Sequence, residues 1–296
     1  MAADRAIRLD VGPAEWEARP LRRLLRLWAV YARMDLLFIA RGFKLALAFY
    51  LADLVIGATS AATTFLLAER FGGIGPWSRP AILFMLGYGL IVRGLMESLF
   101  AFNVGFISRR IGRGQLDHML IAPLPIWMSL ITEGFMPFTG SGMLIPGLVL
   151  AFLGLRELPV AASPTWAALL ALNLAGSAAV MLGFNYCWAT LAFWAPRAAE
   201  EINSSTYRMM DQLKQFPLDG LGSLVIGGLV TALPVGLVAW YPARALVGLD
   251  PWSLAPAVTP LAGLISVALA ARLFARGMKQ YGRTGSTRYL SHGFRR

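Results

Sequence analysis

The sequence predicts an all-α integral membrane protein with six transmembrane helices. Hydrophobic residues make up 57% of the 296 residues and charged residues only 15%, whereas soluble proteins average about 45–50% and about 25%. The mean hydropathy is +0.60. A soluble domain of this size could not bury so much apolar surface, and so hydrophobic a chain does not stay disordered. These observations exclude an ordinary soluble enzyme and indicate a protein that is embedded in a lipid bilayer.

Six apolar runs are long enough to cross a bilayer, which takes about 20 residues in a helix. They cover residues 45–68, 80–105, 126–154, 166–194, 221–241 and 254–277. The third and fourth runs are longer than a crossing needs, so we expect each to tilt or to include an interfacial turn. The whole chain, 1–296, is then one membrane domain, with a cytoplasmic or interfacial segment 1–44, the spans 45–277 and a cytoplasmic tail 278–296.

The segment before the first span has the pattern of an amphipathic helix. Apolar residues recur at helical spacing, and arginines occupy the other face; the apolar set is Leu21, Leu24, Leu25, Trp28 and Ala32, and the basic set is Arg22, Arg23, Arg26 and Arg33. We expect this helix to lie along the membrane surface. The alternative is a basic flank that only sets the topology. Residues 1–20 contain four acidic residues and no apolar core, so they are not a secretory signal.

The basic residues predict the orientation of the chain. With the N-terminus in the cytoplasm, 22 of the 27 basic residues fall in cytoplasmic segments and only four in outer loops. This asymmetry fits the positive-inside rule and places both termini in the cytoplasm. Trp77, Trp240, Tyr241 and Trp252 then fall at the outer interface, where aromatic residues anchor spans. The net charge of +11 therefore reflects orientation and contact with anionic lipids, and nucleic acid is not needed to explain it.

Catalytic and cofactor motifs are missing from the sequence. The single cysteine, Cys187, and the two histidines, His118 and His292, cannot build a cysteine–histidine metal site. None of the three lysines stands in a phosphate-binding loop of the G-x-x-x-x-G-K-[ST] type. Ser141 lies between two glycines, but both histidines fall in cytoplasmic segments, so no Ser–His pair is available in the bilayer. We expect no metal and no catalytic residue, and no ATP site in this chain.

The most informative segment lies between the second and third spans. It reads ISRRIGRGQLDHMLIAPLP over residues 107–125, and three arginines precede a short amphipathic stretch. Pro123 and Pro125 end that stretch. One interpretation is a basic loop that anchors two spans. The other is a short helix that is presented to a cytoplasmic partner.

This segment resembles the cytoplasmic loop of type-2 ATP-binding-cassette exporter permeases, in which a string of the form R-G-x-L-D-x-x-L-x-x-P-L recurs. Three further stretches resemble that family in the expected order: WATLAFWAPR at 188–197, VTALPVGLVAWYPARALVG at 230–248 and RGMKQYGRTGS at 276–286. Each string alone is weakly specific, but together they cover nearly the whole chain. Arg283, Thr284 and His118 depart from the common pattern of the family.

The resemblance implies a permease without its own ATPase, located in the bacterial cytoplasmic (inner) membrane. A separate nucleotide-binding subunit, which carries ATP and Mg, would dock on a coupling helix between spans two and three. Two permeases, identical or paralogous, and two ATPase subunits would form the exporter. The candidate coupling residues are Arg109, Arg110, Arg113, Gly114, Gln115, Leu116, Asp117 and Pro123. The alternative for the arginines is contact with phospholipid alone.

Charged residues within or near the spans form a second candidate site: Asp53, Arg93, Glu97 and Glu133. An unpaired charge costs at least about 2.5–3.5 kcal/mol at the bilayer centre. Arg93 and Glu97 are four residues apart and can meet on one helix face, and Asp53 could be a partner from the first span. One interpretation is that this patch lines a translocation path or a dimer interface. The other is that it forms an ion-pair staple, that is, ion pairs that hold spans one and two together. The rival functions for the chain are an ion-gradient-driven carrier and a membrane scaffold.

Overall fold

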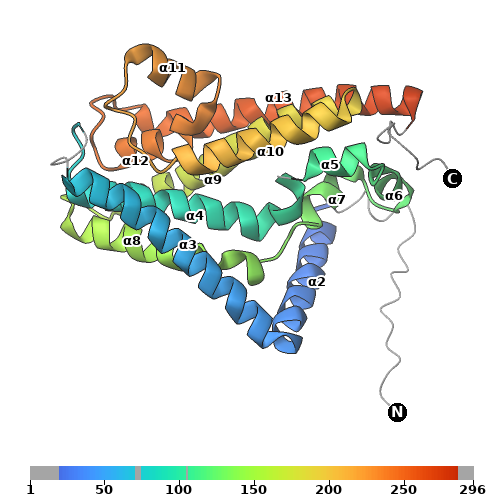
Figure 1. The fold of residues 1–296 in the computed structure, drawn as a ribbon, viewed down its shortest axis with the longest axis horizontal. Helices are drawn as coiled ribbons and strands as arrows, with labels where there is room; N and C mark the ends of the chain where they lie inside the picture. Colours follow the sequence, from blue (N-terminus) through green and yellow to red (C-terminus); the bar gives the residue numbers. More distant parts are fainter. Residues whose placement is uncertain (1–19, 71–74, 105, 286–296) are drawn as a thin grey trace.

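The computed structural model describes residues 20–70, 75–104 and 106–285, and all regular structure in these ranges is helical (Figure 1). The elements are α2 (Pro20–Arg41), α3 (Phe43–Arg70), α4 (Arg79–Val104), α5 (Ile107–Gly112), α6 (Leu116–Ile121), α7 (Ile126–Thr132), η1 (Thr139–Ser141), α8 (Leu144–Glu157), α9 (Pro164–Ala189), η2 (Thr190–Phe193), α10 (Pro196–Leu213), α11 (Ser223–Thr231), η3 (Pro234–Leu237), α12 (Trp240–Leu246) and α13 (Ala255–Thr284).

Five segments of the described chain are long and apolar enough to cross a membrane: 43–66, 79–101, 139–157, 164–193 and 255–284. They agree with the predicted first, second, fourth and sixth spans, and this supports a multi-pass membrane protein. The predicted third span, 126–154, is wrong at its start. Its first part is the separate short helix α7, and the crossing helix begins only at η1. Gly134 and Pro137 lie in the break, and proline removes a helical backbone donor.

The core of the bundle is α4, which packs between α8 and α9, while α3 and α13 are largely exposed. Small residues allow the close approach of α4 and α8. A Cβ atom at Gly87 would lie only 2.3 Å from the backbone nitrogen of Ala151. The outward faces of α3 and α13 are apolar, with residues such as Leu54 and Leu264 exposed. This arrangement suits a bundle surrounded by lipid tails, because packing of small residues, not burial from water, brings membrane helices together.

The bundle has two ends that can be told apart by their contacts. At the α5–α6 end, α5 packs against η2 and α10, next to the C-terminal parts of α9 and α13. At the opposite end, here named the α12 end, Trp166 at the start of α9 donates a hydrogen bond from its indole nitrogen to the carbonyl of Leu246 over 3.0 Å. Trp77, just before α4, lies at this end too, because it shares the acceptor Asp219 with Trp240 of α12.

The predicted fifth span, 221–241, does not run along the bundle. Both of its ends lie at the α12 end, because Asp219, just before the segment, accepts a hydrogen bond from Trp240 near its end over 2.5 Å. The segment is broken into α11 and the η3–α12 stretch, which are bent by 71°. Pro234 and the glycines around it account for the break, since this stretch cannot continue one helix.

Instead, α10 runs along the bundle from the α5–α6 end to the α12 end (Figure 1). Its first turn contacts α5 through Glu200, and the chain reaches Asp219 only six residues after its last residue. The expectation that residues 195–220 form a cytoplasmic loop is therefore wrong. The basic residues assigned to that loop, Arg197, Arg208 and Lys214, lie on or just after this helix. A search for apolar runs misses such a helix because only one of its faces is apolar.

Candidate functional site

The segment 106–125 forms two short helices at one end of the bundle, α5 and α6, joined by a tight turn. Gly114 in that turn has φ +73°, a conformation that residues with a side chain rarely adopt. The backbone nitrogen of Gln115 donates to the carbonyl of Arg110 over 2.9 Å and closes the turn. Pro123 and Pro125 follow the end of α6, as the sequence predicts.

One face of α6 is buried and the other is open. Leu116 and Met119 pack into a small core with Ile107 and Ile111 of α5. The open side carries Ile121, which is 81% exposed, and Leu120, which is 50% exposed. Arg113, Gln115, His118 and Pro123 are also exposed. Leu120 and Ile121 were not among the predicted contact residues, although their place beside the buried positions of an amphipathic stretch is the signal that could have identified them.

Arg109 joins α5 to α10. Its guanidinium lies 2.5 Å from the carboxylate of Glu200 and 5.3 Å from the ring centre of Phe106. A second contact joins the same two helices, because the amide of Asn203 lies 3.4 Å from the hydroxyl of the buried Ser108. Helix α5 is thus connected directly to α10 by two side-chain contacts.

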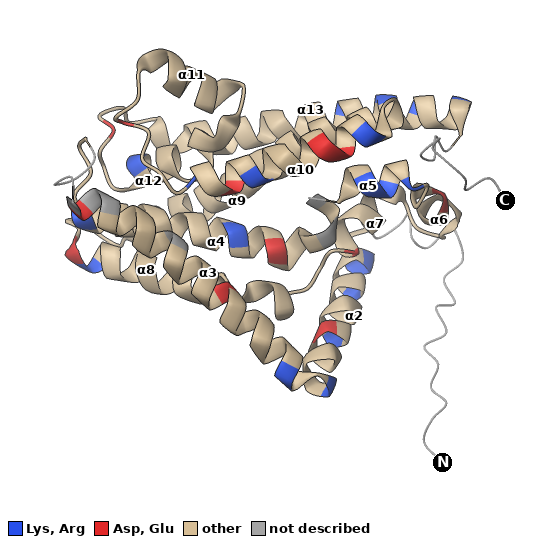
Figure 2. Cartoon of the chain, in the orientation of Figure 1, with Lys and Arg blue, Asp and Glu red and all other residues tan. Residues whose placement is uncertain are grey.

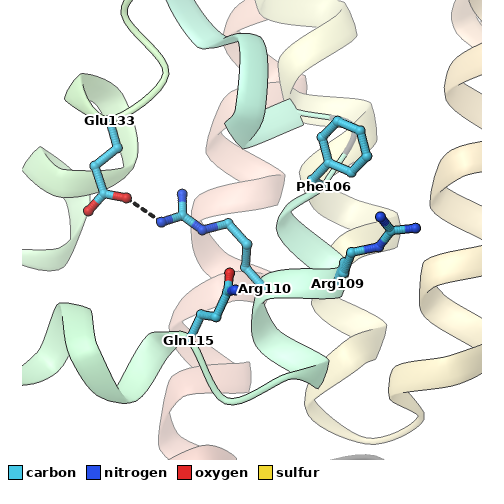
Figure 3. Close-up of a pocket in the computed structure, with 5 residues that line it drawn as sticks. All are labelled: Phe106, Arg109, Arg110, Gln115 and Glu133. Carbon is cyan, nitrogen blue, oxygen red and sulfur yellow. Dashed lines mark hydrogen bonds and ion pairs between the residues drawn. The ribbon is translucent and has the colours of Figure 1, made fainter. Parts of the chain in front are cut away.

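Arg110 is the centre of an internal network (Figure 3). Its guanidinium donates to Glu133 at the end of α7 and to the side-chain oxygen of Asn103 at the end of α4. Asn103 is fully buried and donates in turn to the carbonyl of Leu130 over 2.6 Å. Glu133 therefore belongs to this network and not to the charges in the middle of the bundle.

A cavity of about 470 Å³ opens beside this network. Its walls come from α5, α6 and α7 and include Phe106, Arg109, Arg110, Gln115 and Glu133 (Figure 3).

Asp117 on α6 accepts a hydrogen bond from the hydroxyl of Tyr281 on α13. Three of the predicted coupling residues, Arg109, Arg110 and Asp117, are thus bound within the chain, and Leu116 lies in the core. Gly114 shapes the turn, whereas Arg113, Gln115 and Pro123 lie on the open surface. The predicted set therefore divides into residues that face outward and residues that fix α5 and α6 to the rest of the bundle.

The helix α2 packs beside this segment. Arg23 donates to the carbonyl of Pro123 over 2.9 Å, and the indole of Trp28 stacks on Phe135 with ring centres 5.3 Å apart. Arg22 and Arg26 are exposed. Burial raises the pKa of the nearby Tyr31 phenol and the Glu133 carboxylate raises it further, against the effect of Arg110.

Asp35, which the sequence analysis did not single out, fixes the other part of α2. Its carboxylate accepts from the backbone nitrogens of Phe138 and Thr139 over 2.8 and 3.1 Å. It also accepts from the hydroxyl of Thr139, so it caps the helical turn η1 that opens the third crossing. Asp35 is a lone acidic residue among apolar and basic neighbours, and this isolation could have marked it as a residue with a structural role.

The charges in the middle of the bundle join α4 to α10. Arg93 lies 2.9 Å from Glu97 on its own helix and 3.2 Å from Asp211 on α10. Asp211 also pairs with Lys214, whose side chain is only 1% exposed. The predicted staple between α3 and α4 is not formed, because Asp53 makes no ion pair within the described residues and is only under the longer-range influence of Arg93. Asp211 and Lys214 were missed because their segment was assigned to a loop.

At the α12 end, the side chain of Asp219 holds three other side chains together. Its carboxylate accepts from the indole nitrogens of Trp77 and Trp240, each over 2.5 Å, and pairs with Arg244. Asp250 lies 3.8 Å from the same arginine. Trp77 and Trp240 thus share one end of the bundle, opposite to the arginine-rich α5–α6 segment.

Comparison with known proteins identifies the family. A family model described as "ABC-2 family transporter protein" matches residues 54–285, which is most of the chain. The chain belongs to the ABC-2 transporter family. No curated protein and no solved structure matches the chain. As an ABC-2 family membrane protein it is a permease subunit of an ABC transporter, which works with an ABC ATPase and is not an enzyme by itself. The matched region contains α5, α6 and α10, and it leaves out α2.

Proposed function

We propose that this permease is one membrane half of an ATP-driven exporter of the bacterial cytoplasmic membrane. In this proposal α6 is the coupling helix, and ATP and Mg are bound by the separate ATPase subunit. The α5–α6 end would then face the cytoplasm and the α12 end the outside. The observation that carries the proposal is that α5, which directly precedes the exposed tip of α6, is joined by the Arg109–Glu200 ion pair to α10, the helix that runs along the bundle.

The open face of α6 has the composition of a docking surface. Leu120 and Ile121 present exposed apolar side chains, and Arg113, Gln115 and His118 are exposed in the same segment. A central apolar anchor with a polar rim is typical of protein interfaces. Phospholipid contact by the arginines alone would explain neither the exposed Ile121 nor the internal ion pairs of Arg109 and Arg110.

Movement of α6 would be transmitted through contacts that are already present. Arg109 connects α5 to α10 through Glu200, Asp117 connects α6 to α13 through Tyr281, and Arg23 connects α2 to the end of α6 through Pro123. Closure of an ATPase dimer would thus pull on several crossing helices together. The cavity beside Arg110 provides room for this shift.

The translocation path would run along α10 and the charged part of α4. Arg93, Glu97 and Asp211 lie on these two helices, and a hydrated path accommodates charges that lipid does not. Two permeases would enclose this path between them. Lipids would cover the apolar faces of α3 and α13.

The test is co-purification of this permease with its candidate ATPase subunit, followed by ATPase and transport assays in vesicles. We expect Ile121→Asp to reduce co-purification at least about tenfold, because a charge would be buried in the interface. Leu254→Asp is the matched control, since Leu254 is 60% exposed but precedes α13 at the α12 end. Equal co-purification of both variants would refute α6 as the coupling helix. Transport that persists without any ATPase and follows an ion gradient would favour the rival carrier.

A further inference from the structure

The C-terminal half of α13 carries basic residues along one face, here named the basic face (Figure 2). Its members are Arg272, Arg276, Lys279 and Arg283. Residues at such intervals of three and four share one side of a helix, and all four side chains are exposed. The buried Ala270, Gly277 and Tyr281 lie on the opposite side of α13. The basic face therefore points away from the bundle.

No acidic residue of α13 balances these charges. The helix contains neither Asp nor Glu, and among the residues that the structure describes none of the four cations forms an ion pair. Arg93, Arg109 and Arg110 differ in this respect, because each of them binds a carboxylate within the chain. The basic face thus presents its charges to whatever surrounds the protein.

The basic face continues an apolar face of the same helix. Leu261, Ile265 and Ala268 precede Arg272 at the same spacing and are also exposed. Leu261 is 57% exposed and Ile265 is 69% exposed, as expected for side chains that contact lipid tails. The surroundings of this side of α13 must therefore change along the helix, from hydrocarbon to groups that suit cations. A phospholipid leaflet has the same order, from acyl chains to phosphates.

The change from apolar to basic residues occurs near the depth of an exposed tryptophan. Ala271 and Phe274 of α13 line a cavity of about 270 Å³ together with Trp127 of α7, so Arg272 and Trp127 lie at similar levels. Trp127 is 45% exposed, and tryptophan is enriched at the interface between membrane and water. Arg272 therefore lies where phospholipid headgroups are expected.

Only part of the basic face fits into one headgroup layer. This layer is about 5–8 Å thick, because a bilayer measures about 40–45 Å with its headgroups and about 30 Å without them. Along a helix that follows the membrane normal, Arg276 lies about 6 Å beyond Arg272, whereas Arg283 lies about 16 Å beyond it. Arg272 and Arg276 are thus the two cations that one layer of phosphates can contact together.

We propose that Arg272 and Arg276 bind the phosphate of an anionic phospholipid, whose acyl chains lie along Leu261 and Ile265. A guanidinium group can donate two parallel hydrogen bonds to phosphate oxygens, which favours arginine at such a site. A zwitterionic headgroup carries its own ammonium group, and the basic face offers no carboxylate to bind it. The site should therefore select lipids with a net negative charge.

A lipid at this site would also act on α6. Tyr281, on the buried side of α13, donates a hydrogen bond to Asp117 of α6. A phospholipid that holds the outer side of α13 in place would keep this contact in place as well. ATP-driven transport should therefore increase with the fraction of anionic lipid in the membrane. This consequence rests on the proposed function, whereas the lipid site itself does not.

Lipid binding to the purified permease alone tests the site. Phosphatidylglycerol, which is anionic, and phosphatidylcholine, which is zwitterionic, are added to the protein in detergent, and bound lipid is measured by native mass spectrometry. Arg272→Gln combined with Arg276→Gln should lower the affinity for phosphatidylglycerol about 25-fold, which is about fivefold for each cation lost. Arg272→Lys combined with Arg276→Lys should lower it less than about fivefold, because both charges remain.

Arg79→Gln combined with Arg156→Gln is the matched control, because it removes two exposed charges at the α12 end. There Arg79 lies 3.8 Å from Glu69, and Gly154, close to Arg156, packs on the start of α4. The affinity of this control for phosphatidylglycerol should change less than about twofold. The proposal is overturned if the glutamine variant of the basic face binds phosphatidylglycerol as tightly as the unaltered chain, or if the unaltered chain binds both lipids equally.

Two further measurements separate the lipid site from the proposed function. If the glutamine variant retains lipid binding but loses co-purification with the ATPase subunit, the basic face docks that protein and the lipid site is refuted. Transport in vesicles of increasing phosphatidylglycerol content should rise for the unaltered chain and stay low for the glutamine variant, and equal responses would refute the effect on α6. If the ATPase subunit does not bind even the unaltered chain, the proposed function fails, while the lipid titration still decides the site.

Discussion

Arg109 on α5 donates to Glu200 on α10 over 2.5 Å, and so connects the segment predicted to dock a partner with the polar helix of the bundle. The two residues are 91 positions apart in the sequence. The arginine side chain is 43% exposed, so water screens the pair and its contribution to folding stability is small, about 0–1 kcal/mol. Its importance should therefore lie in transmission of movement.

Glu200→Gln should weaken this link while it leaves the fold and ATPase binding intact. We expect ATP-driven transport to fall about tenfold, since the amide gives only a neutral hydrogen bond to Arg109. Transport by reconstituted vesicles and co-purification with the ATPase are the two measurements. Glu157→Gln is the control, because Glu157 is exposed at the end of α8, away from α10, and forms no ion pair among the described residues. Equal transport by both variants would show that the Arg109–Glu200 pair does not transmit movement.

Arg110→Ala should destabilise the α5–α6 end. The substitution leaves the buried Asn103 oxygen without its donor, which costs about 1–3 kcal/mol, and it also removes the ion pair of Arg110 with Glu133. Thermal unfolding in detergent should show a lower Tm for this variant. Arg113→Ala, in which an exposed arginine is lost, should be close to the unaltered protein. A Tm for Arg110→Ala that matches the Arg113 control would contradict the network.

Gly87→Ala should loosen the contact of α4 with α8. The added Cβ would lie 2.3 Å from the Ala151 nitrogen, which is backbone and cannot move aside without moving a helix. Overpacking of this kind costs about 1–3 kcal/mol. Gly228→Ala is the control, since a Cβ there meets no atom within 4 Å. Retained stability in the Gly87 variant would mean that the two helices are further apart than the structure has them.

Asp219→Ala should open the α12 end of the bundle. Three donors, on Trp77, Trp240 and Arg244, lose their acceptor, and the loss of one partner of a partly buried charged pair costs about 3–5 kcal/mol. We expect faster proteolysis of the loops at this end. Asp250→Ala should have a much smaller effect, because Asp250 lies 3.8 Å from Arg244. Identical digestion rates for the two variants would contradict the role of Asp219.

Much of the helical framework could be predicted from the sequence, because four of the spans are continuous apolar runs that can be recognised from their own residues. The amphipathic helix before the first span, α2, could also be predicted from its spacing of apolar and basic residues. The resemblance to type-2 ATP-binding-cassette permeases is confirmed by the match to the ABC-2 family. The course of α10 along the bundle could not be found this way. The segment 221–241 is apolar but broken at Pro234, whereas α10 is polar on one face and still runs along the bundle.

The candidate residues show the same division. The sequence singled out Arg93 and Glu97 because charges in an apolar run are conspicuous, but the partner of Arg93 on α10 depended on a topology that the sequence had assigned differently. In the segment of α5 and α6, the sequence analysis singled out the charged Arg109, Arg110 and Asp117 as coupling residues. These three bind within the chain, and the exposed tip is the apolar Ile121.

The sequence by itself determined that this chain is embedded in lipid and is a permease, because these properties depend on composition, local hydrophobicity and family motifs. Only the tertiary structure decided that α10 runs along the bundle, that segment 221–241 is bent by 71°, and which residues of α5 and α6 are exposed. The physical reason is that a half-polar helix is stabilised in a membrane bundle by contacts with distant elements, such as Arg93 with Asp211 and Arg109 with Glu200. Such contacts leave no periodic signal along the chain.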